Sequence, residues 1–292
     1  MSMQEMTAVI TRFQTATDAL AALGARLGIG EADTVSPEIL AALDQVLAAA
    51  GVTDVDGLEP QQRAMLAGLI RTMFAQSADL LGHPARAAGW SYTDPVVLEG
   101  VGRGSMMMPT LLGGSGEFTD VSSLLDIGTG VGLLAVSAAR VWPECTVVGI
   151  DVWEPSLELA RRNVTAAGLD HRIELRRQDM QDLDDTDRYD CVWVPTFFFG
   201  PEAIAAALPK IIRSTLPDGQ VVMAHYEPPP DPLPRATMRL RTIRDGGSVL
   251  DSGGAAELLR GAGCKDVHSL TRTWPIPFGF VTGRSTARTA TG

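Results

Sequence analysis

The chain has 292 residues, and 45% of them are hydrophobic, so it can bury a substantial core without metals or disulfides. Its formal net charge of −11 argues against a broad nucleic-acid interface, and its sequence contains no apolar run of about eighteen residues that would predict a membrane span. Its three cysteines, Cys145, Cys191 and Cys264, lack metal-ligand spacing and are typical of buried thiols. Because no signal-peptide pattern is visible either, we expect a cytoplasmic protein with no metal site, nucleic-acid partner or membrane anchor.

The first 85 residues predict three amphipathic helices. Ser2 and Glu5 form a capping-box pattern, and apolar residues then recur at helical spacing as far as Leu27. Pro37 opens a second helix that Gly51 ends, and residues 60–81 predict a third. Because residues 1–85 carry four arginines and ten acidic residues, we expect this part to be a poor binder of duplex nucleic acid.

Residues 89–116 connect these helices to the remainder of the chain. Gly113–Gly116 predicts a hinge between a helical N-terminal domain, residues 1–112, and a second domain, residues 113–284. Four side chains of this stretch are candidates for lining a substrate pocket: Trp90, Tyr92, Arg103 and Met107. The alternative is that the aromatic and methionine side chains fill a core and that the arginine is a surface charge.

A strand, a glycine-rich turn and a helix follow one another in the middle of the chain. The apolar run 122–127 predicts a buried strand and residues 133–140 predict a helix. Gly128, Gly130 and Gly132 lie between them, where glycines allow a ligand to approach the backbone closely.

The residues around this turn distinguish two kinds of ligand. A dinucleotide site has the pattern G-x-G-x-x-G, whereas Leu133 stands where that third glycine would be. Asp126, two residues before the first glycine, suits a positively charged ligand better than a pyrophosphate. Asp151 ends the next predicted strand, residues 146–150, where a carboxylate can accept hydrogen bonds from ribose hydroxyls.

With the run Asp126-Ile-Gly-Thr-Gly-Val-Gly132, this second carboxylate makes the chain resemble class I S-adenosylmethionine (SAM)-dependent methyltransferases. The chain is most similar in outline to natural-product O-methyltransferases that begin with a helical dimerisation domain. The resemblance covers roughly residues 122–284. It implies a Rossmann-like α/β fold with a seven-stranded mixed sheet after an all-helical N-terminal domain. It also implies SAM as cofactor, a homodimer and a small-molecule acceptor.

The resemblance also implies which residues bind the cofactor. Asp179 follows a third predicted strand, residues 172–176, where the family places its adenine contacts. Trp153 is a candidate for packing on adenine, with a staple at a helix start as the alternative. The full cofactor set is Asp126, Gly128, Gly130, Gly132, Asp151, Val152, Trp153, Asp179, Met180 and Pro195. We expect the other acidic residues of this region to lie in a solvated loop: Asp182, Asp184, Asp185, Asp187 and Asp190.

A predicted strand at 189–194 leads into three consecutive phenylalanines, residues 197–199. Open α/β sheets bind ligands at the carboxyl ends of their strands, and three successive rings cannot all face one core. Phe197 and Phe198, with Tyr226 after the predicted strand 220–224, are therefore candidates for the acceptor pocket. The alternative is that the three phenylalanines all pack beneath the N-terminal helices.

The chain departs from plant-type O-methyltransferases, which place a catalytic histidine just after the fourth strand. His225, at the carboxyl end of the predicted strand 220–224, is our candidate general base, and a structural role is the alternative. A carboxylate, acidic phenol, enol carbon or amine acceptor requires no base.

We therefore expect methyl transfer from SAM to a small, secondary-metabolite-like acceptor, with O-methylation favoured. The alternatives are C- or N-methylation of a small molecule or peptide, a non-catalytic SAM-fold binding protein, and a nicotinamide-dependent oxidoreductase. Further helices are predicted at 201–214, 235–244 and 252–261, and strands at 267–270 and 278–281. Residues 285–292 are expected to be a disordered tail.

Overall fold

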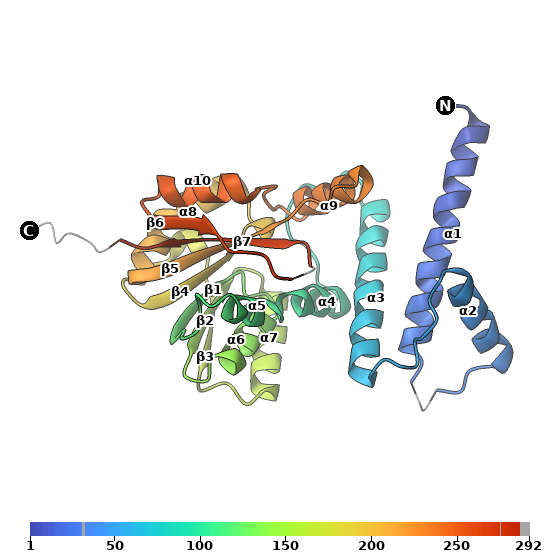
Figure 1. Cartoon of the computed structure of the whole chain (residues 1–292), viewed down its shortest axis with the longest axis horizontal. Coiled ribbons are helices and arrows are strands. Elements are labelled where there is room, and N and C mark those ends of the chain that lie inside the picture. Colours follow the sequence, from blue (N-terminus) through green and yellow to red (C-terminus); the bar gives the residue numbers. More distant parts are fainter. Residues whose placement is uncertain (31–32, 275, 287–292) are drawn as a thin grey trace, which may run out of the picture. The chain divides into compact units, whose positions relative to one another are not determined.

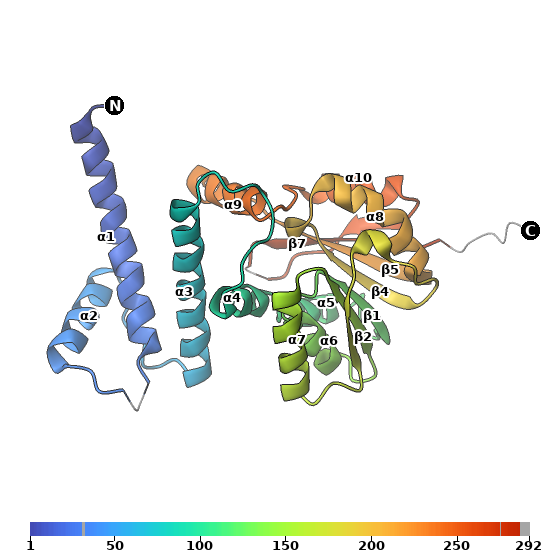
Figure 2. The same cartoon turned by 180° about the vertical axis from the view of Figure 1, so that it is seen from behind.

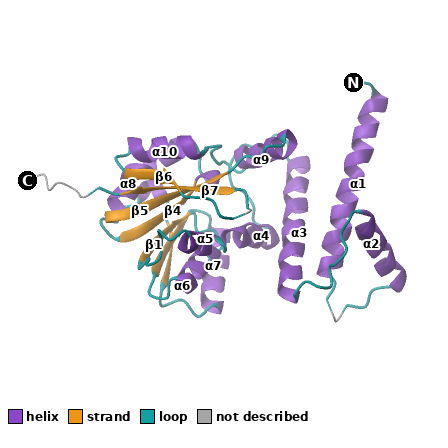
Figure 3. Cartoon of the chain, viewed as in Figure 1, coloured by secondary structure: helices purple, strands orange, loops and turns teal. Residues whose placement is uncertain are grey.

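The computed structural model of the protein describes residues 1–30, 33–274 and 276–286. The chain divides into two compact units, residues 1–84 and residues 85–292. The described part of the first unit contains helices and loops, whereas the second combines helices with a β-sheet (Figure 3).

The first unit consists of α1 (Met3–Gly28), α2 (Pro37–Ala49) and α3 (Pro60–Gly82), which confirms the three predicted helices. The predicted capping box is present, because the Glu5 N–H donates to Ser2 Oγ at 3.2 Å and the Ser2 N–H donates to the Glu5 carboxylate at 2.6 Å. The small core of this unit is formed by Leu27, Leu47, Val55, Ala67 and Ile70. The outer face of α1 is exposed, with Met6, Ile10 and Phe13 at 40%, 57% and 49% exposure.

The second unit opens with two helices, α4 (Pro95–Ser105) and α5 (Met108–Gly114). Its strands are β1 (Ser123–Ile127), β2 (Thr146–Asp151), β3 (Ile173–Arg177), β4 (Tyr189–Pro195), β5 (Thr215–Tyr226), β6 (Lys265–Ser269) and β7 (Phe278–Arg284). Its other helices are α6 (Leu133–Val141), α7 (Glu154–Ala166), α8 (Pro201–Ser214), α9 (Pro232–Arg244) and α10 (Ser252–Gly261), with single 3-10 turns η1 (Met180–Asp182) and η2 (Thr196–Phe198).

The seven strands form one mixed sheet in the order β3-β2-β1-β4-β5-β7-β6. The first five strands are parallel, and β7 runs antiparallel to both of its neighbours. In Figure 1, α8 and α10 lie on one side of the sheet and α5, α6 and α7 on the other; Figure 2 shows the same layers from behind. The predicted Rossmann-like fold with a seven-stranded mixed sheet is confirmed. The arrangement brings the carboxyl ends of β1, β2, β4 and β5 to one edge.

The helices α4 and α5 belong to the second unit, so the division of the structure does not coincide with the predicted boundary at residues 112/113. Gly102 of α4 packs on the glycine turn so closely that an added Cβ would lie 2.2 Å from Val131 Cγ2. Ser137 Oγ of α6 also donates to the Met106 carbonyl at 2.6 Å. The first two glycines of the predicted hinge, Gly113 and Gly114, are the last residues of α5.

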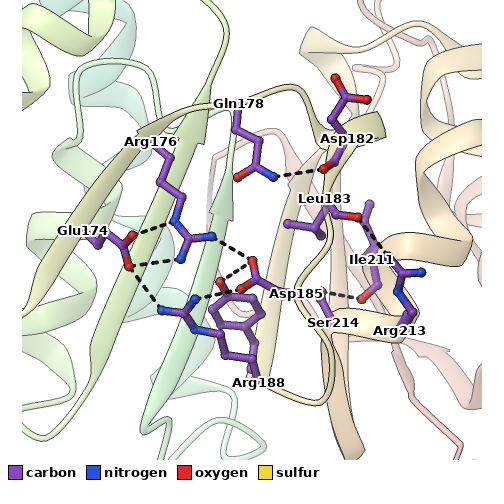
Figure 4. A network of polar contacts seen from close by, with 11 residues as sticks. Glu174, Arg176, Gln178, Asp182, Leu183, Asp185, Arg188, Ile211, Arg213 and Ser214 are labelled. Atoms are coloured by element: carbon purple, nitrogen blue, oxygen red, sulfur yellow. Dashed lines mark hydrogen bonds and ion pairs between the residues drawn. The ribbon is translucent and has the colours of Figure 1, made fainter.

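The expectation of a solvated acidic loop is wrong for Asp185 and Asp190. Asp185 has a side chain only 9% exposed, and it accepts hydrogen bonds from Arg176, Arg188 and the Tyr189 hydroxyl (Figure 4). Burial raises the pKa of the Asp185 carboxyl, but these hydrogen bonds and the guanidinium charge of Arg176 together hold that pKa below its usual value. The network ties β3 to the start of β4, because Glu174 of β3 also pairs with Arg188.

Asp190 joins the start of β4 to the start of β1. Its carboxylate accepts hydrogen bonds from the Ser122 N–H, Ser122 Oγ and the Ser123 N–H at 2.8, 2.6 and 3.0 Å. An acidic run in the sequence therefore contains two side chains that hold strands in place.

Several whole-chain expectations can be compared with the structure. All three cysteines are buried thiols, as predicted. No helix within residues 1–30, 33–274 and 276–286 is both long and apolar enough to cross a bilayer. In the same described residues, no group of three or more His, Cys, Asp and Glu side chains is arranged to hold a metal ion. Ser285, placed in the predicted tail, is buried and its N–H donates to the Gly219 carbonyl at 2.8 Å; residues 287–292 lie outside the described residues.

Candidate active site

The glycine turn between β1 and α6 has a left-handed backbone at all three glycines. The φ angles of Gly128, Gly130 and Gly132 are 68°, 56° and 73°, a region that side chains strongly disfavour. An added Cβ would lie 2.7 Å from the Phe199 ring at Gly128 and 3.1 Å from Ala160 Cβ at Gly132. At Gly130 it would first meet the Gly128 carbonyl oxygen, at 3.9 Å. The outer two glycines thus serve packing, and Gly130 is the point at which the turn leaves room for a ligand.

Asp126, the last-but-one residue of β1, is a buried carboxyl beneath this turn. Its side chain is 1% exposed and accepts a hydrogen bond from Thr129 Oγ1 at 2.7 Å. Burial raises the pKa of Asp126 to about 7; the Thr129 hydrogen bond opposes this shift, and the negative charge of Asp151 adds to it. A cationic group bound nearby would favour the ionised carboxylate, so the site is suited electrostatically to a positively charged ligand.

Asp151 ends β2 and is tied to the backbone on both sides. One carboxylate oxygen accepts the Gly130 N–H and the other accepts the Trp153 N–H, each at 2.8 Å. Burial raises the pKa of this carboxyl, and the same backbone hydrogen bonds work against the shift. Since a carboxylate oxygen has more than one lone pair, each can still accept a hydrogen bond from a ligand hydroxyl.

This set of groups fits SAM. Two carboxylates side by side suit the ammonium, sulfonium and ribose hydroxyls of SAM, and they would repel the phosphates of a dinucleotide. The space beside Gly130, which a Cβ would fill, is open for the ligand. When bound, SAM supplies a methyl group already activated on a sulfonium, so the chain's own residues have to bind, orient and shield it.

The remaining predicted cofactor residues differ in their surroundings. Val152 is 53% exposed, whereas Met180 is 5% exposed and packs in the core on the α8 and α10 side of the sheet. The Asp179 carboxylate accepts the Gln181 N–H at 2.8 Å and so caps η1. Pro195 is buried at the end of β4.

Six aromatic side chains gather beside the carboxyl ends of β4 and β5, and we call them the aromatic cluster: Trp90, Tyr92, Phe197, Phe198, Tyr226 and Phe278. Trp90 packs edge to face on Tyr92 and on Phe198, with ring centroids 5.0 and 5.4 Å apart. The contacts continue from Phe198 to Phe197 at 4.8 Å and from Phe197 to Tyr226 at 4.7 Å. Phe278 of β7 closes the cluster, 4.9 Å from Tyr226.

The structure therefore brings together five of the seven predicted substrate residues: Trp90, Tyr92, Phe197, Phe198 and Tyr226. The other two, Arg103 and Met107, are exposed and make no ring contact in the described part of the chain. Phe278 could not be identified as a pocket residue from the sequence, because nothing in the pattern of β7 indicates that it lies beside β5 residues. Phe199 was also not among the predicted site residues; its ring packs on Gly128, and its place as the third phenylalanine after β4 was the available signal.

His225 lies on the other face of the sheet from the aromatic cluster. Side chains alternate along β5, so His225 points to the α8 and α10 side together with Met223, and Tyr226 points the opposite way. The imidazole is 1% exposed, its Nε2 is 3.8 Å from Glu227 Oε1, and Nε2 has no hydrogen-bond partner among the described residues.

Comparison with protein families assigns a methyltransferase domain to residues 124–219. Over 111 residues the chain is 35% identical to the ribosomal protein uL3 glutamine methyltransferase of Bradyrhizobium diazoefficiens, covering 36% of this chain and 35% of that protein. Over 106 residues it is 30% identical to the tRNA1(Val) (adenine(37)-N6)-methyltransferase of Vibrio vulnificus, covering 36% of this chain and 44% of that protein. The chain thus matches less than half the length of either relative.

Solved structures match nearly the whole chain in fold. Human N-acetylserotonin methyltransferase in complex with SAM superposes with a TM-score of 0.71 at 13% identity, covering 98% of this chain and 100% of that one. The mitomycin 7-O-methyltransferase MmcR gives a TM-score of 0.70 at 18% identity, covering 97% of each chain. Residues 124–219 thus match a methyltransferase domain, the chain as a whole has the fold of class I SAM-dependent methyltransferases, and these likenesses support SAM as its cofactor.

Proposed function

We propose that the protein transfers a methyl group from SAM to a small aromatic acceptor of the secondary-metabolite type, with oxygen as the favoured nucleophile. The observation that carries the proposal is the aromatic cluster at the ends of β4 and β5, next to the glycine turn that Phe199 contacts. Flat ring systems pack well on aromatic side chains, and the partly exposed rings of Trp90, Phe198, Tyr226 and Phe278 supply such a surface. The fold of the two small-molecule enzymes named above agrees with this substrate class.

Each group then has a definite task. Asp126 and Asp151 hold the positive and hydroxyl groups of the cofactor, and the aromatic cluster holds the acceptor. Burial, and secondarily the charge of Asp245, raises the pKa of Tyr226 to about 12. The phenol is therefore protonated at neutral pH, so it can donate a hydrogen bond to the acceptor but cannot remove its proton.

A methyl-transfer assay tests the proposal. The purified protein is incubated with SAM and, in separate reactions, with phenols, aromatic carboxylic acids, aromatic amines, glutamine-containing peptides and unmodified tRNA. We expect a mass gain of one methyl on a phenol or carboxylic acid, and release of S-adenosylhomocysteine (SAH). Methylation of the peptide or tRNA alone would overturn the small-molecule assignment. The negative net charge already argues against tRNA.

His225 is the candidate base if the acceptor must lose a proton, but its imidazole is 1% exposed and lies on the opposite face of the sheet from the aromatic cluster, so we expect its alternative, structural role. A base should lose at least about a hundredfold in kcat when His225 is replaced by Asn, with KM for SAM unchanged. A purely structural histidine should instead lower Tm and leave kcat per folded molecule intact. Comparison with His171→Asn, an exposed histidine in the turn before β3, controls for loss of an imidazole.

We further propose that the protein is a homodimer that uses the exposed face of α1. Met6, Ile10 and Phe13 lie on one side of that helix at helical spacing, and each is at least 40% exposed. Ile10→Asp should convert a dimer to a monomer in light scattering, whereas Thr11→Asp, on the opposite side of α1, should not. A wild-type protein that is monomeric at all concentrations would refute the dimer.

A further inference from the structure

A short segment, residues 86–92, carries two members of the aromatic cluster and is held by contacts from several elements. The Gly89 N–H donates to the Arg244 carbonyl at the end of α9, at 3.0 Å. Arg86 Nη1 donates to the Gly89 carbonyl at 2.5 Å, and its guanidinium lies 5.6 Å from the Tyr92 ring centre. Trp90 reaches across to Phe198, so the position of this segment determines the shape of the aromatic cluster.

One residue joins this segment to the cofactor groups. The Trp153 indole Nε1–H donates to the Tyr92 carbonyl at 2.7 Å, while the Trp153 backbone N–H donates to Asp151 at 2.8 Å. The other oxygen of Asp151 accepts the Gly130 N–H at 2.8 Å. An unbroken path of short hydrogen bonds therefore runs from Gly130 through Asp151 and Trp153 to Tyr92.

We propose that Trp153 is a positioning residue that transmits the presence of the cofactor to the aromatic cluster, an inference that rests on the proposed function. A ligand whose hydroxyls bond to Asp151 fixes that carboxylate. The fixed carboxylate holds the Trp153 backbone, and the indole then holds residues 86–92. Ordering of this kind is reciprocal, so an acceptor seated on Trp90 and Tyr92 tightens the cofactor by the same factor. The acceptor surface is thus more ordered when the cofactor is bound.

This role differs from that of a residue which merely packs against adenine. An adenine platform requires the Trp153 ring but not its N–H, whereas transmission to Tyr92 requires the N–H. Trp153→Phe separates the two, because it keeps an aromatic ring and removes the donor. The matched control is Trp142→Phe, which removes an indole N–H whose hydrogen bond has nearly the same length, 2.8 Å to the Phe118 carbonyl, on another part of the unit.

The experiment is hydrogen exchange read by mass spectrometry, on the full-length protein with and without SAH as the probe. In wild type and in Trp142→Phe, we expect SAH to slow exchange at least about fivefold both in the glycine turn and in residues 86–92. In Trp153→Phe we expect the glycine turn to be slowed as before and residues 86–92 to exchange as in the free protein. If Trp153→Phe does not fold, Trp153→Leu, which also lacks the donor, is read in the same way.

The outcomes separate this inference from the function on which it rests. If SAH slows exchange in the glycine turn of the wild-type protein but not in residues 86–92, the coupling is overturned and the methyltransferase assignment stands. Protection of residues 86–92 that survives in Trp153→Phe also overturns it. SAH that protects neither region in wild type overturns the proposed function itself, and the coupling falls with it.

Discussion

The two proposed ligand-binding regions of the second unit are built from different interactions. On the cofactor side, carboxylates are fixed by hydrogen bonds of 2.7–2.8 Å from Thr129 and from backbone N–H groups. On the acceptor side, rings from residues 90–92, η2, β5 and β7 touch at centroid distances of 4.7–5.5 Å. Hydrogen bonds to backbone define positions tightly, whereas ring contacts are adaptable. We infer that cofactor choice is fixed by the fold and that acceptor choice can be changed by substituting single rings.

The sharpest test of this contrast is Asp151→Ala. Removing the carboxylate should weaken SAM binding by about 1–3 kcal/mol, or roughly 5- to 150-fold, because the ribose hydroxyls lose their acceptor. Calorimetric titration measures the change. Phe198→Ala, made in parallel, should leave SAM affinity within about twofold and raise KM for the acceptor. Unchanged SAM affinity in a folded Asp151→Ala protein would falsify the placement of the ribose.

Asp126→Asn separates stability from binding on the cofactor side. Because burial raises the pKa of Asp126 to about 7, the folded protein retains this proton at pH values where the unfolded chain has lost it. Stability therefore falls as pH rises from about 4 to about 7, and the full loss persists above pH 7. The uncharged amide would remove that loss, so Tm measured at pH 8 should rise, by a stabilisation on the order of 2 kcal/mol, while SAM binding weakens. Asp120→Asn, at an exposed site, should change neither.

Gly102→Ala tests the packing of α4 on the glycine turn. A Cβ at Gly102 would meet Val131 Cγ2 at 2.2 Å, so the variant should lose about 1–3 kcal/mol in urea unfolding and should bind SAM less tightly. At Gly104, in the same helix, no described heavy atom beyond the local helix backbone lies within 4 Å of the ideal Cβ position. Gly104→Ala should therefore gain up to about 1 kcal/mol from helix propensity. Equal behaviour of the two variants would contradict the packing described for α4.

The smallest effect is expected for an ion pair that lies outside both proposed ligand-binding regions. His268 of β6, at the far edge of the sheet from β3, has its pKa raised by the Asp266 carbonyl and then by Glu117, whose carboxylate lies 3.0 Å away. A raised histidine pKa stabilises the fold below the unfolded value near 6.5, and this stabilisation is lost as pH rises through the folded value. Since both side chains are partly exposed, Glu117→Gln should lower stability by only a few tenths of a kcal/mol at about pH 5.5 and by nothing at about pH 9. A difference that persists at the higher pH would contradict this account, and SAM binding should not change.

Much of the cofactor side could be predicted from the sequence, because its parts are close together in the chain. The strand, the three glycines and Asp126 adjoin one another, and Asp151 follows at the end of the next strand. The three left-handed φ values show why those positions are glycine. The contacts that place α4 on this turn, such as Gly102 against Val131, involve no local pattern and could not be predicted.

The acceptor side was predicted only in part, for a physical reason. Phe197 and Phe198 follow a strand end, which is a visible signal, but their partners Trp90 and Phe278 come from distant segments. The face on which His225 points depends on the register of β5, which begins at Thr215, earlier than the predicted residue 220, and pairs with β4 across an irregularity. Because side chains alternate between the two faces of a strand, a register shift of one residue moves every side chain of that strand to the opposite face.

The distribution of the five tryptophans gives this protein an optical property of its own. Trp142, Trp193 and Trp274 are at most 6% exposed, and all three pack in the core on one face of the sheet. Trp90 and Trp153 are partly exposed; Trp153 bonds to both Asp151 and Tyr92, and Trp90 packs on Tyr92 in the aromatic cluster. Emission on the long-wavelength side of the indole band therefore comes mainly from these two partly exposed side chains, so ligand binding near them should change the intrinsic fluorescence without any label.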